Sequence, residues 1–178
     1  MHTWIALLRG INVGGKNILP MRTLRDLLNE LGYTDIKTVI QSGNCVFRAR
    51  SKSAKRVAAD IAKAINTAFG FRPQVLCLTG ADLSKAIASN PYRSAAANDG
   101  KAVHFYFLSE AAMSADLDAL RALCDTSEAF ELTDQVFYLL APNGIGRSKV
   151  AARAEANLGV PVTARNFRTV QKLAALAG

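Results

Sequence analysis

The chain has 178 residues, half of them apolar, and its 22 Lys and Arg against 14 Asp and Glu give a net charge of +8. This length is enough for one large or two small domains with a substantial core. No apolar run approaches the roughly 20 residues that span a bilayer, and the N-terminus lacks a signal-peptide pattern. We therefore expect a cytoplasmic protein with no membrane partner.

The first half of the chain predicts the element order βαββαβ. Apolar runs indicate strands over residues 4–9, 36–41, 45–47 and 74–78. One helix, opened by Pro20 at its first position and closed by Gly32, follows the first strand. A second helix, capped by Ser53 and ending near Gly70, precedes the fourth strand.

The second half predicts the same order again. A short helix over residues 82–89 and a loop-rich junction over residues 90–100 come first. Strands are expected over residues 103–108, 130–132, 136–140 and 162–165. Ser114 and Ser148 are the expected caps of the two intervening helices, and a last helix spans residues 167–177.

The repeated order predicts an α+β fold of two tandem ferredoxin-like (α/β-plait) units with a C-terminal helix, over residues 1–90 and 91–178. In such units the helices cover one face of the sheet. Residues 4–8, 105–108 and 136–140 are nevertheless apolar at successive positions, which is typical of strands buried on both faces. We therefore expect the two sheets to pack on each other or on a second subunit.

The segment Gly10-Ile-Asn-Val-Gly-Gly-Lys-Asn17 follows the first strand. A glycine-rich turn ending in lysine places backbone N–H groups and an ammonium where an anion can bind. It matches a P-loop except that Asn17 replaces the magnesium-binding Ser or Thr and that the helix starts too late. We therefore predict a looser anion site without nucleotide hydrolysis, the alternative being a glycine loop needed only for a sharp turn. The predicted ligand-binding residues here are Arg9, Asn12, Gly14, Gly15, Lys16 and Asn17.

The segment Gln41-Ser-Gly-Asn44 suits a two-residue hairpin turn, which alone explains its composition. If it faces the glycine-rich segment, its amides add neutral donors and acceptors to the same site. Gln41, Ser42 and Asn44 are therefore candidate ligand-binding residues. No nucleophilic role is expected for Ser42, because no histidine lies nearby in the sequence.

Two turns in the second half place cations at predicted helix N-termini. Arg147 and Lys149 flank the capping residue Ser148, and Arg165 precedes the cap candidate Asn166. The helix dipole destabilises a cation at this position by up to about 1 kcal/mol. A bound anion is instead stabilised by the dipole and by the cations together. These five residues complete the predicted site, although capping alone is sufficient reason for Ser148.

The charge is distributed unevenly along the chain. Residues 1–90 carry 13 Lys and Arg against 5 Asp and Glu, residues 91–146 carry 3 against 8, and residues 147–178 carry 6 against 1. Two basic segments therefore flank an acidic one. This distribution is either an ordinary solvated surface or a basic patch, built from both ends of the chain, for an anionic ligand or nucleic acid. The three cysteines, widely spaced and odd in number, predict reduced thiols, and no Cys or His spacing predicts a metal site. No cofactor is expected.

These motifs, together with Asn90-Pro91, Pro142-Asn-Gly-Ile-Gly-Arg-Ser-Lys149 and Thr163-Ala-Arg-Asn166, resemble the DUF1697 family of bacterial proteins. The resemblance runs from the first strand to the last helix and covers nearly the whole chain. It implies two α/β-plait units, in agreement with the strand order above. It implies no activity, because the domain of this family is one of unknown function.

We hypothesise a protein that binds a phosphorylated or otherwise anionic small molecule, with an unidentified reaction or none. Lys16 and Arg147 would neutralise the anion, and Asn12 and Asn166 would orient it. A nucleic-acid-binding module is the first alternative, favoured by a pI near 9.7 and opposed by the acidic middle segment. The second alternative is a structural or protein-interaction domain without a ligand.

Overall fold

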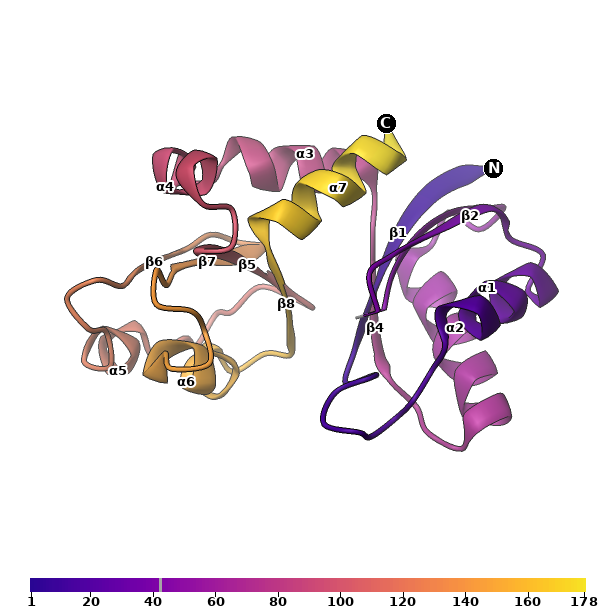
Figure 1. Cartoon of the computed structure of the whole chain (residues 1–178), viewed down its shortest axis with the longest axis horizontal. Coiled ribbons are helices and arrows are strands. Elements are labelled where there is room, and N and C mark those ends of the chain that lie inside the picture. The colour runs from indigo at the N-terminus through magenta and orange to yellow at the C-terminus, as the bar shows by residue number, and fades with distance from the viewer. Residues whose placement is uncertain (42) are drawn as a thin grey trace. The chain divides into compact units, whose positions relative to one another are not determined.

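The computed structural model describes residues 1–41 and 43–178 and has a mixed α/β fold (Figure 1). Its described residues form seven helices and two four-stranded antiparallel sheets. The chain divides into two compact units, one made of Met1–Lys85 with Gln171–Gly178 and the other of Ala86–Val170. The predicted division into domains at residue 90 stays a prediction. No helix in the described ranges is both long and apolar enough to cross a bilayer.

The first unit has the predicted βαββαβ order. Its elements are β1 (His2–Arg9), α1 (Met21–Glu30), β2 (Thr34–Val39), β3 (Asn44–Ala49), α2 (Ala54–Phe69) and β4 (Gln74–Leu78). The strands lie in the order β2-β3-β1-β4, so β1 is central and pairs with both β3 and β4. Ile5 of β1, for example, lies opposite Val46 of β3 and Leu78 of β4.

Local signals set the ends of both helices in this unit. The Ser53 hydroxyl caps α2 as predicted and accepts a hydrogen bond from the Arg56 N–H at 3.3 Å. Gly70 ends the same helix in the left-handed conformation at φ 74°, where glycine carries no steric penalty. Pro20 precedes α1 rather than opening it, because its ψ of 138° is extended and helical geometry begins at Met21.

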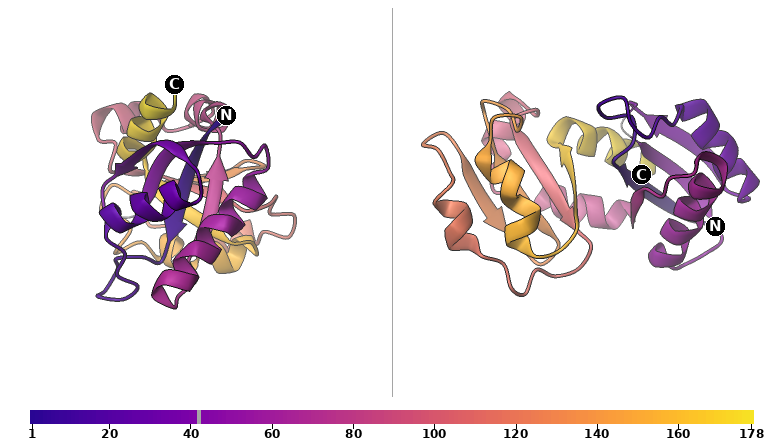
Figure 2. Two further views of the ribbon diagram at one scale, coloured as in Figure 1. Left: turned by 90° about the vertical axis from the view of Figure 1, so that its right-hand side faces the viewer. Right: turned by 90° about the horizontal axis from the view of Figure 1, so that it is seen from below.

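The core of the first unit lies between its sheet and the helices α1 and α2, which cover one sheet face in both figures (Figures 1 and 2). Leu8 points from β1 into this core, where the buried Leu24 and Ile61 come from the two helices. On the opposite face of β1, Ile5 and Leu7 are also completely buried. The expectation that this strand is covered on both faces is therefore confirmed.

The second unit repeats the order βαββαβ. Its elements are β5 (Val103–Leu108), α5 (Leu117–Arg121), β6 (Ala129–Leu132), β7 (Val136–Leu140), α6 (Lys149–Leu158) and β8 (Val162–Asn166). The strand order is β6-β7-β5-β8, which is the order of the first sheet position by position. Three helices lie outside this pattern, namely α3 (Gly80–Ala88), α4 (Arg93–Asn98) and α7 (Phe167–Ala177).

Two sequence predictions for this unit are wrong. The junction expected to be loop-rich contains α4, whose entry is shaped by the Tyr92 N–H donating to the Asn90 side chain at 3.0 Å. The cap of α5 is Asp116 rather than Ser114, because the Asp116 carboxylate accepts the Ala119 N–H at 2.9 Å. A carboxylate two residues further along thus starts the helix later than expected.

The sheet of the second unit is also buried on both faces. Helices α5 and α6 cover one face, around Tyr106 and Leu139. On the other face the Phe105 ring contacts Tyr138 edge-on at 4.8 Å between centroids and Phe167, the first residue of α7, at 5.8 Å. The Tyr138 hydroxyl donates to the Ala86 carbonyl of α3 at 2.8 Å. Helices therefore supply part of the cover that was expected from a second sheet or subunit.

Candidate functional site

The glycine-rich segment folds back on itself as a short hairpin between β1 and α1 (Figure 1). The Asn12 N–H donates to the Asn17 carbonyl, and the Lys16 N–H donates to the Val13 carbonyl, both at 3.1 Å. Gly14 and Gly15 occupy the two central positions with φ of 58° and 72°. Two consecutive left-handed residues are what a type I′ turn requires, so glycine at both positions has a structural reason. We call residues 10–18 the glycine loop.

Asn12 holds the glycine loop in place with its whole side-chain amide. Its Nδ2 donates to the carbonyls of Leu19 and Gln41, each at 2.8 Å, and its Oδ1 accepts the Leu19 N–H at 2.7 Å. Asn17 makes a similar internal bond, from its Nδ2 to the Gly10 carbonyl at 2.8 Å. Both asparagines have positive φ, near 50°, which Asn tolerates better than other L-residues. They shape the loop from within.

The bond to Gln41 joins the glycine loop to the turn between β2 and β3. Gly43 in this turn has a φ of 73°, and a Cβ there would lie 2.6 Å from Ile11 Cδ1 and 2.8 Å from Leu8 Cβ. Its carbonyl accepts the Leu8 N–H at 2.8 Å. The two segments therefore do lie against each other, which the sequence left open, and only glycine fits where they meet.

The predicted ligand-binding residues of this turn are placed differently from one another. The Gln41 side chain is exposed, and its carbonyl is the group that receives Asn12. Asn44 is completely buried, with its Nδ2 donating to the Val39 carbonyl at 3.1 Å. A buried, hydrogen-bonded amide of this kind belongs to the sheet. Ser42 lies outside the described residues.

The tip of the glycine loop carries the hydrogen-bond donors that could bind a ligand. Lys16 is exposed, and the rest of the described chain offers its ammonium no hydrogen bond or ion pair. The N–H groups of Gly14 and Gly15 likewise have no acceptor among residues 1–41 and 43–178. Arg9, at the end of β1, is half-buried and donates to the Gln74 side chain at 3.2 Å. The tip therefore offers two backbone donors and one cation to solvent.

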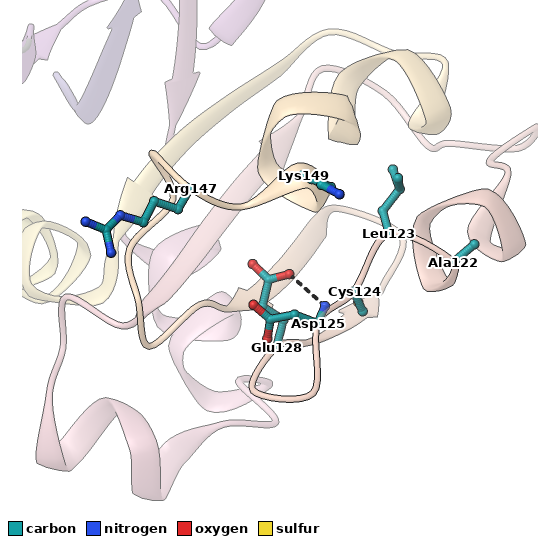
Figure 3. Close-up of a pocket in the computed structure, with 7 residues that line it drawn as sticks. All are labelled: Ala122, Leu123, Cys124, Asp125, Glu128, Arg147 and Lys149. Atoms are coloured by element: carbon teal, nitrogen blue, oxygen red, sulfur yellow. Dashed lines mark hydrogen bonds between the residues drawn. The ribbon is translucent and has the colours of Figure 1, made fainter.

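Two of the predicted cations of the second unit, Arg147 and Lys149, line a pocket of about 260 Å³ (Figure 3). The Ser148 hydroxyl caps α6 as predicted, because it accepts the Ala151 N–H at 2.9 Å. The chain around this cap brings Arg147 and Lys149 to the pocket wall. The full lining is Ala122, Leu123, Cys124, Asp125, Glu128, Arg147 and Lys149.

The same pocket contains two carboxylates, those of Asp125 and Glu128. Asp125 accepts hydrogen bonds from the N–H and hydroxyl of Ser127 at 2.7 and 2.6 Å, and these bonds lower the pKa of Asp125. Glu128 accepts the Asp125 N–H at 3.3 Å, the bond drawn in Figure 3, where the Arg147 guanidinium points away from both carboxylates. Arg147 and Lys149 at the start of α6 thus share their pocket with the carboxylates of Asp125 and Glu128, and the pocket has mixed charge.

The third predicted group lies at the end of β8. The Asn166 side chain accepts the Thr169 N–H at 3.0 Å and so caps α7, as its position suggested. Arg165 is half-buried and donates to the Ala164 carbonyl at 2.8 Å. Burial lowers the pKa of Arg165 to about 10, which leaves it a cation at neutral pH.

The remaining titratable candidates are buried in the two sheets. His104 of β5 is 7% exposed, its Nδ1 has no hydrogen-bond partner in the described residues, and burial lowers its pKa. Cys45 and Cys77 are buried free thiols. No group of three or more His, Cys, Asp or Glu within the described residues has the geometry to hold a metal ion.

Three comparisons place the chain among known proteins. The model of a family described as "Protein of unknown function (DUF1697)" matches residues 1–138. No curated protein matches. Among solved structures, the conserved bacterial protein SP0830 from Streptococcus pneumoniae is similar with a TM-score of 0.68 at 23% identity, over 99% of this chain and 98% of that one. This likeness indicates a shared fold over the whole length.

Proposed function

This chain belongs to the DUF1697 family, and we propose that it binds a phosphorylated or otherwise anionic small molecule at the tip of its glycine loop. The observation that carries the proposal is the combination of a loop fixed from within and donors left over at its surface. Asn12 makes three hydrogen bonds that fix the loop, while two N–H groups of Gly14 and Gly15 and the Lys16 ammonium have no partner within residues 1–41 and 43–178.

A loop that is already ordered binds an anion at a lower entropic cost than a loop that must fold around it. Hydrogen bonds from N–H groups and an ammonium to an anion are charge-assisted, which makes them stronger than bonds between neutral groups. Phosphate and phosphate esters suit this arrangement because they offer several acceptor oxygens. The mixed charge of the pocket beside Arg147 makes it the weaker candidate for an anion.

Hydrolysis of a nucleoside triphosphate is not part of the proposal. In a P-loop the helix begins at the lysine, so that its first N–H groups reach the phosphates. Here α1 begins at Met21, five residues after Lys16, and Asn17 uses its side chain inside the loop. The geometry therefore favours binding over phosphoryl transfer.

The test is a thermal-shift panel with inorganic phosphate, sulfate, sugar phosphates, nucleotides and a short oligonucleotide. A ligand at about 100 times its Kd adds roughly 2.7 kcal/mol of stability, which for a chain of this size is a shift of about 5–10 °C. Lys16→Ala should abolish the shift, whereas Lys63→Ala, which removes an exposed cation from α2, should leave it. A flat panel, or equal shifts in the two variants, would remove the basis of the proposal.

The same panel separates the alternative functions. A nucleic-acid-binding module responds to the oligonucleotide alone and loses affinity steeply with added salt, because several phosphate contacts release counterions. A domain that acts only through protein contacts responds to nothing in the panel. A response confined to small phosphorylated compounds supports the proposed function against both.

We also propose that both units are ferredoxin-like and that the protein is cytoplasmic. The fold assignment is supported by the βαββαβ order and by the matching strand orders β2-β3-β1-β4 and β6-β7-β5-β8. The location is supported by the three cysteines, all of which are free thiols. An experimental structure and cell fractionation are the respective tests.

A further inference from the structure

Three large aliphatic side chains are exposed on the glycine loop and on the turn bonded to it. Val13 is 67% exposed, Ile18 is 56% exposed and Ile40 is 54% exposed. Val13 and Ile18 flank the tip within the loop itself. Ile40 is the chain neighbour of Gln41, whose carbonyl receives the Asn12 side chain at 2.8 Å. Exposed aliphatic side chains therefore lie on the loop that presents Lys16 and on the turn bonded to that loop.

Ile40 also has a backbone conformation that is costly for its residue type. Its φ is 50°, in the left-handed region that β-branched residues avoid. Ile40 is 54% exposed, so burial of its side chain explains only part of why isoleucine occupies this left-handed position. Strained residues that a fold retains are concentrated at ligand-binding positions, where the strain holds a side chain in a useful place.

We infer that the anion bound by the glycine loop is one end of an amphiphile, a phosphate monoester carried on an aliphatic body. This inference rests on the proposed function. The phosphate binds Lys16 and the N–H groups of Gly14 and Gly15, and the aliphatic body covers Val13, Ile18 and Ile40. A sugar phosphate or inorganic phosphate leaves these three side chains in water and gains nothing from them.

The occupant is a single soluble molecule rather than a lipid bilayer. Recognition of an anionic membrane typically uses a cluster of 4–8 Lys and Arg. The glycine loop carries one cation, Lys16, and the neighbouring Arg9 is half-buried against Gln74. One cation beside three aliphatic side chains matches one phosphate on one aliphatic chain.

The experiment measures the affinity of ethyl, butyl and hexyl phosphate by calorimetry. Full burial of a methylene raises affinity about fourfold, and partial cover at an open surface about twofold, so hexyl phosphate should bind about 16-fold more tightly than ethyl phosphate. Lys16→Ala should weaken all three esters by the same factor. Ile40→Asn, which suits the left-handed backbone, should reduce the dependence on chain length and leave ethyl phosphate almost unchanged.

Met113→Asn is the matched control, because Met113 is 90% exposed in the other unit and its loss should change none of these affinities. Equal affinity for the three esters overturns the amphiphile inference while the proposed function stands. No binding of any ester or of inorganic phosphate overturns both. Binding to vesicles of anionic lipid without binding to hexyl phosphate also overturns the inference, and assigns the aliphatic side chains to a membrane surface.

Discussion

Gly43 gives the sharpest test of how the glycine loop is held. A Cβ at this position would lie 2.8 Å from Leu8 Cβ and 2.6 Å from Ile11 Cδ1, and the φ of 73° is itself unfavourable for alanine. Ile11 Cδ1 is the end of a flexible side chain and can rotate away. Leu8 Cβ is attached to the central strand and cannot, so Gly43→Ala must displace backbone.

The expected cost has two parts. A left-handed conformation costs an L-residue roughly 1–2 kcal/mol. Overpacking in a filled site costs about 1–3 kcal/mol more. Gly43→Ala should therefore lower the free energy of unfolding by about 3 kcal/mol, which for a chain of this size lowers the midpoint of thermal unfolding by about 6–12 °C.

Gly70→Ala separates the two parts. Gly70 has nearly the same φ, 74°, but a Cβ there would meet nothing within 4 Å. Its substitution should cost only the conformational part, roughly 1–2 kcal/mol. Urea unfolding of both variants, followed by circular dichroism, gives the difference directly. Equal losses in the two variants would refute the claim that the turn and the glycine loop meet without room for a methyl group.

Three further predictions concern single side chains. Asn12→Asp keeps the acceptor but removes the two N–H donors to the Leu19 and Gln41 carbonyls. It should lower the free energy of unfolding, measured in urea, by about 1–3 kcal/mol. Burial holds the pKa of His104 below its ordinary 6.5. Below pH 6.5 the imidazole is therefore protonated in the unfolded chain but stays neutral in the folded one, and the free energy of unfolding should fall as the pH drops. His104→Phe should flatten that fall between about pH 7.5 and 5.5. Burial raises the pKa of Cys45 and raises that of Cys77 to about 12, so a thiol reagent at pH 8 should modify these two only after urea is added.

The fold was largely predictable because its signals are local. Apolar runs located the eight strands of the described residues, and the hydroxyl caps Ser53 and Ser148 make the predicted bonds. The prediction failed where a competing polar residue lay close by. Asp116 caps α5 in place of Ser114, and α4 forms in a stretch that its flanking Asn, Pro and Gly residues made resemble a loop.

The candidate site was predictable only in part, since its important contacts join distant residues. The glycine pattern located the loop, but nothing in it indicates that the Asn12 side chain forms hydrogen bonds within the protein, to Leu19 and Gln41, instead of pointing to a ligand. The proximity of Asp125 to Lys149 in one pocket follows from the topology, and no spacing rule links residues so far apart. Charge counts by segment could not distinguish a cation facing solvent from one facing an acidic neighbour.

The last helix has a consequence for how the protein is made. Phe167 starts α7 in the second unit, whereas Gln171–Gly178 belong to the first, where Ala177 lies against Gly80. The second unit is thus one uninterrupted stretch of chain, and the first is not. During synthesis on the ribosome, residues 1–85 are made before the helical turns of residues 171–178 that belong to the same unit. Of the two units, the one whose synthesis starts first is therefore completed last, and its glycine loop is made long before the unit has all of its residues.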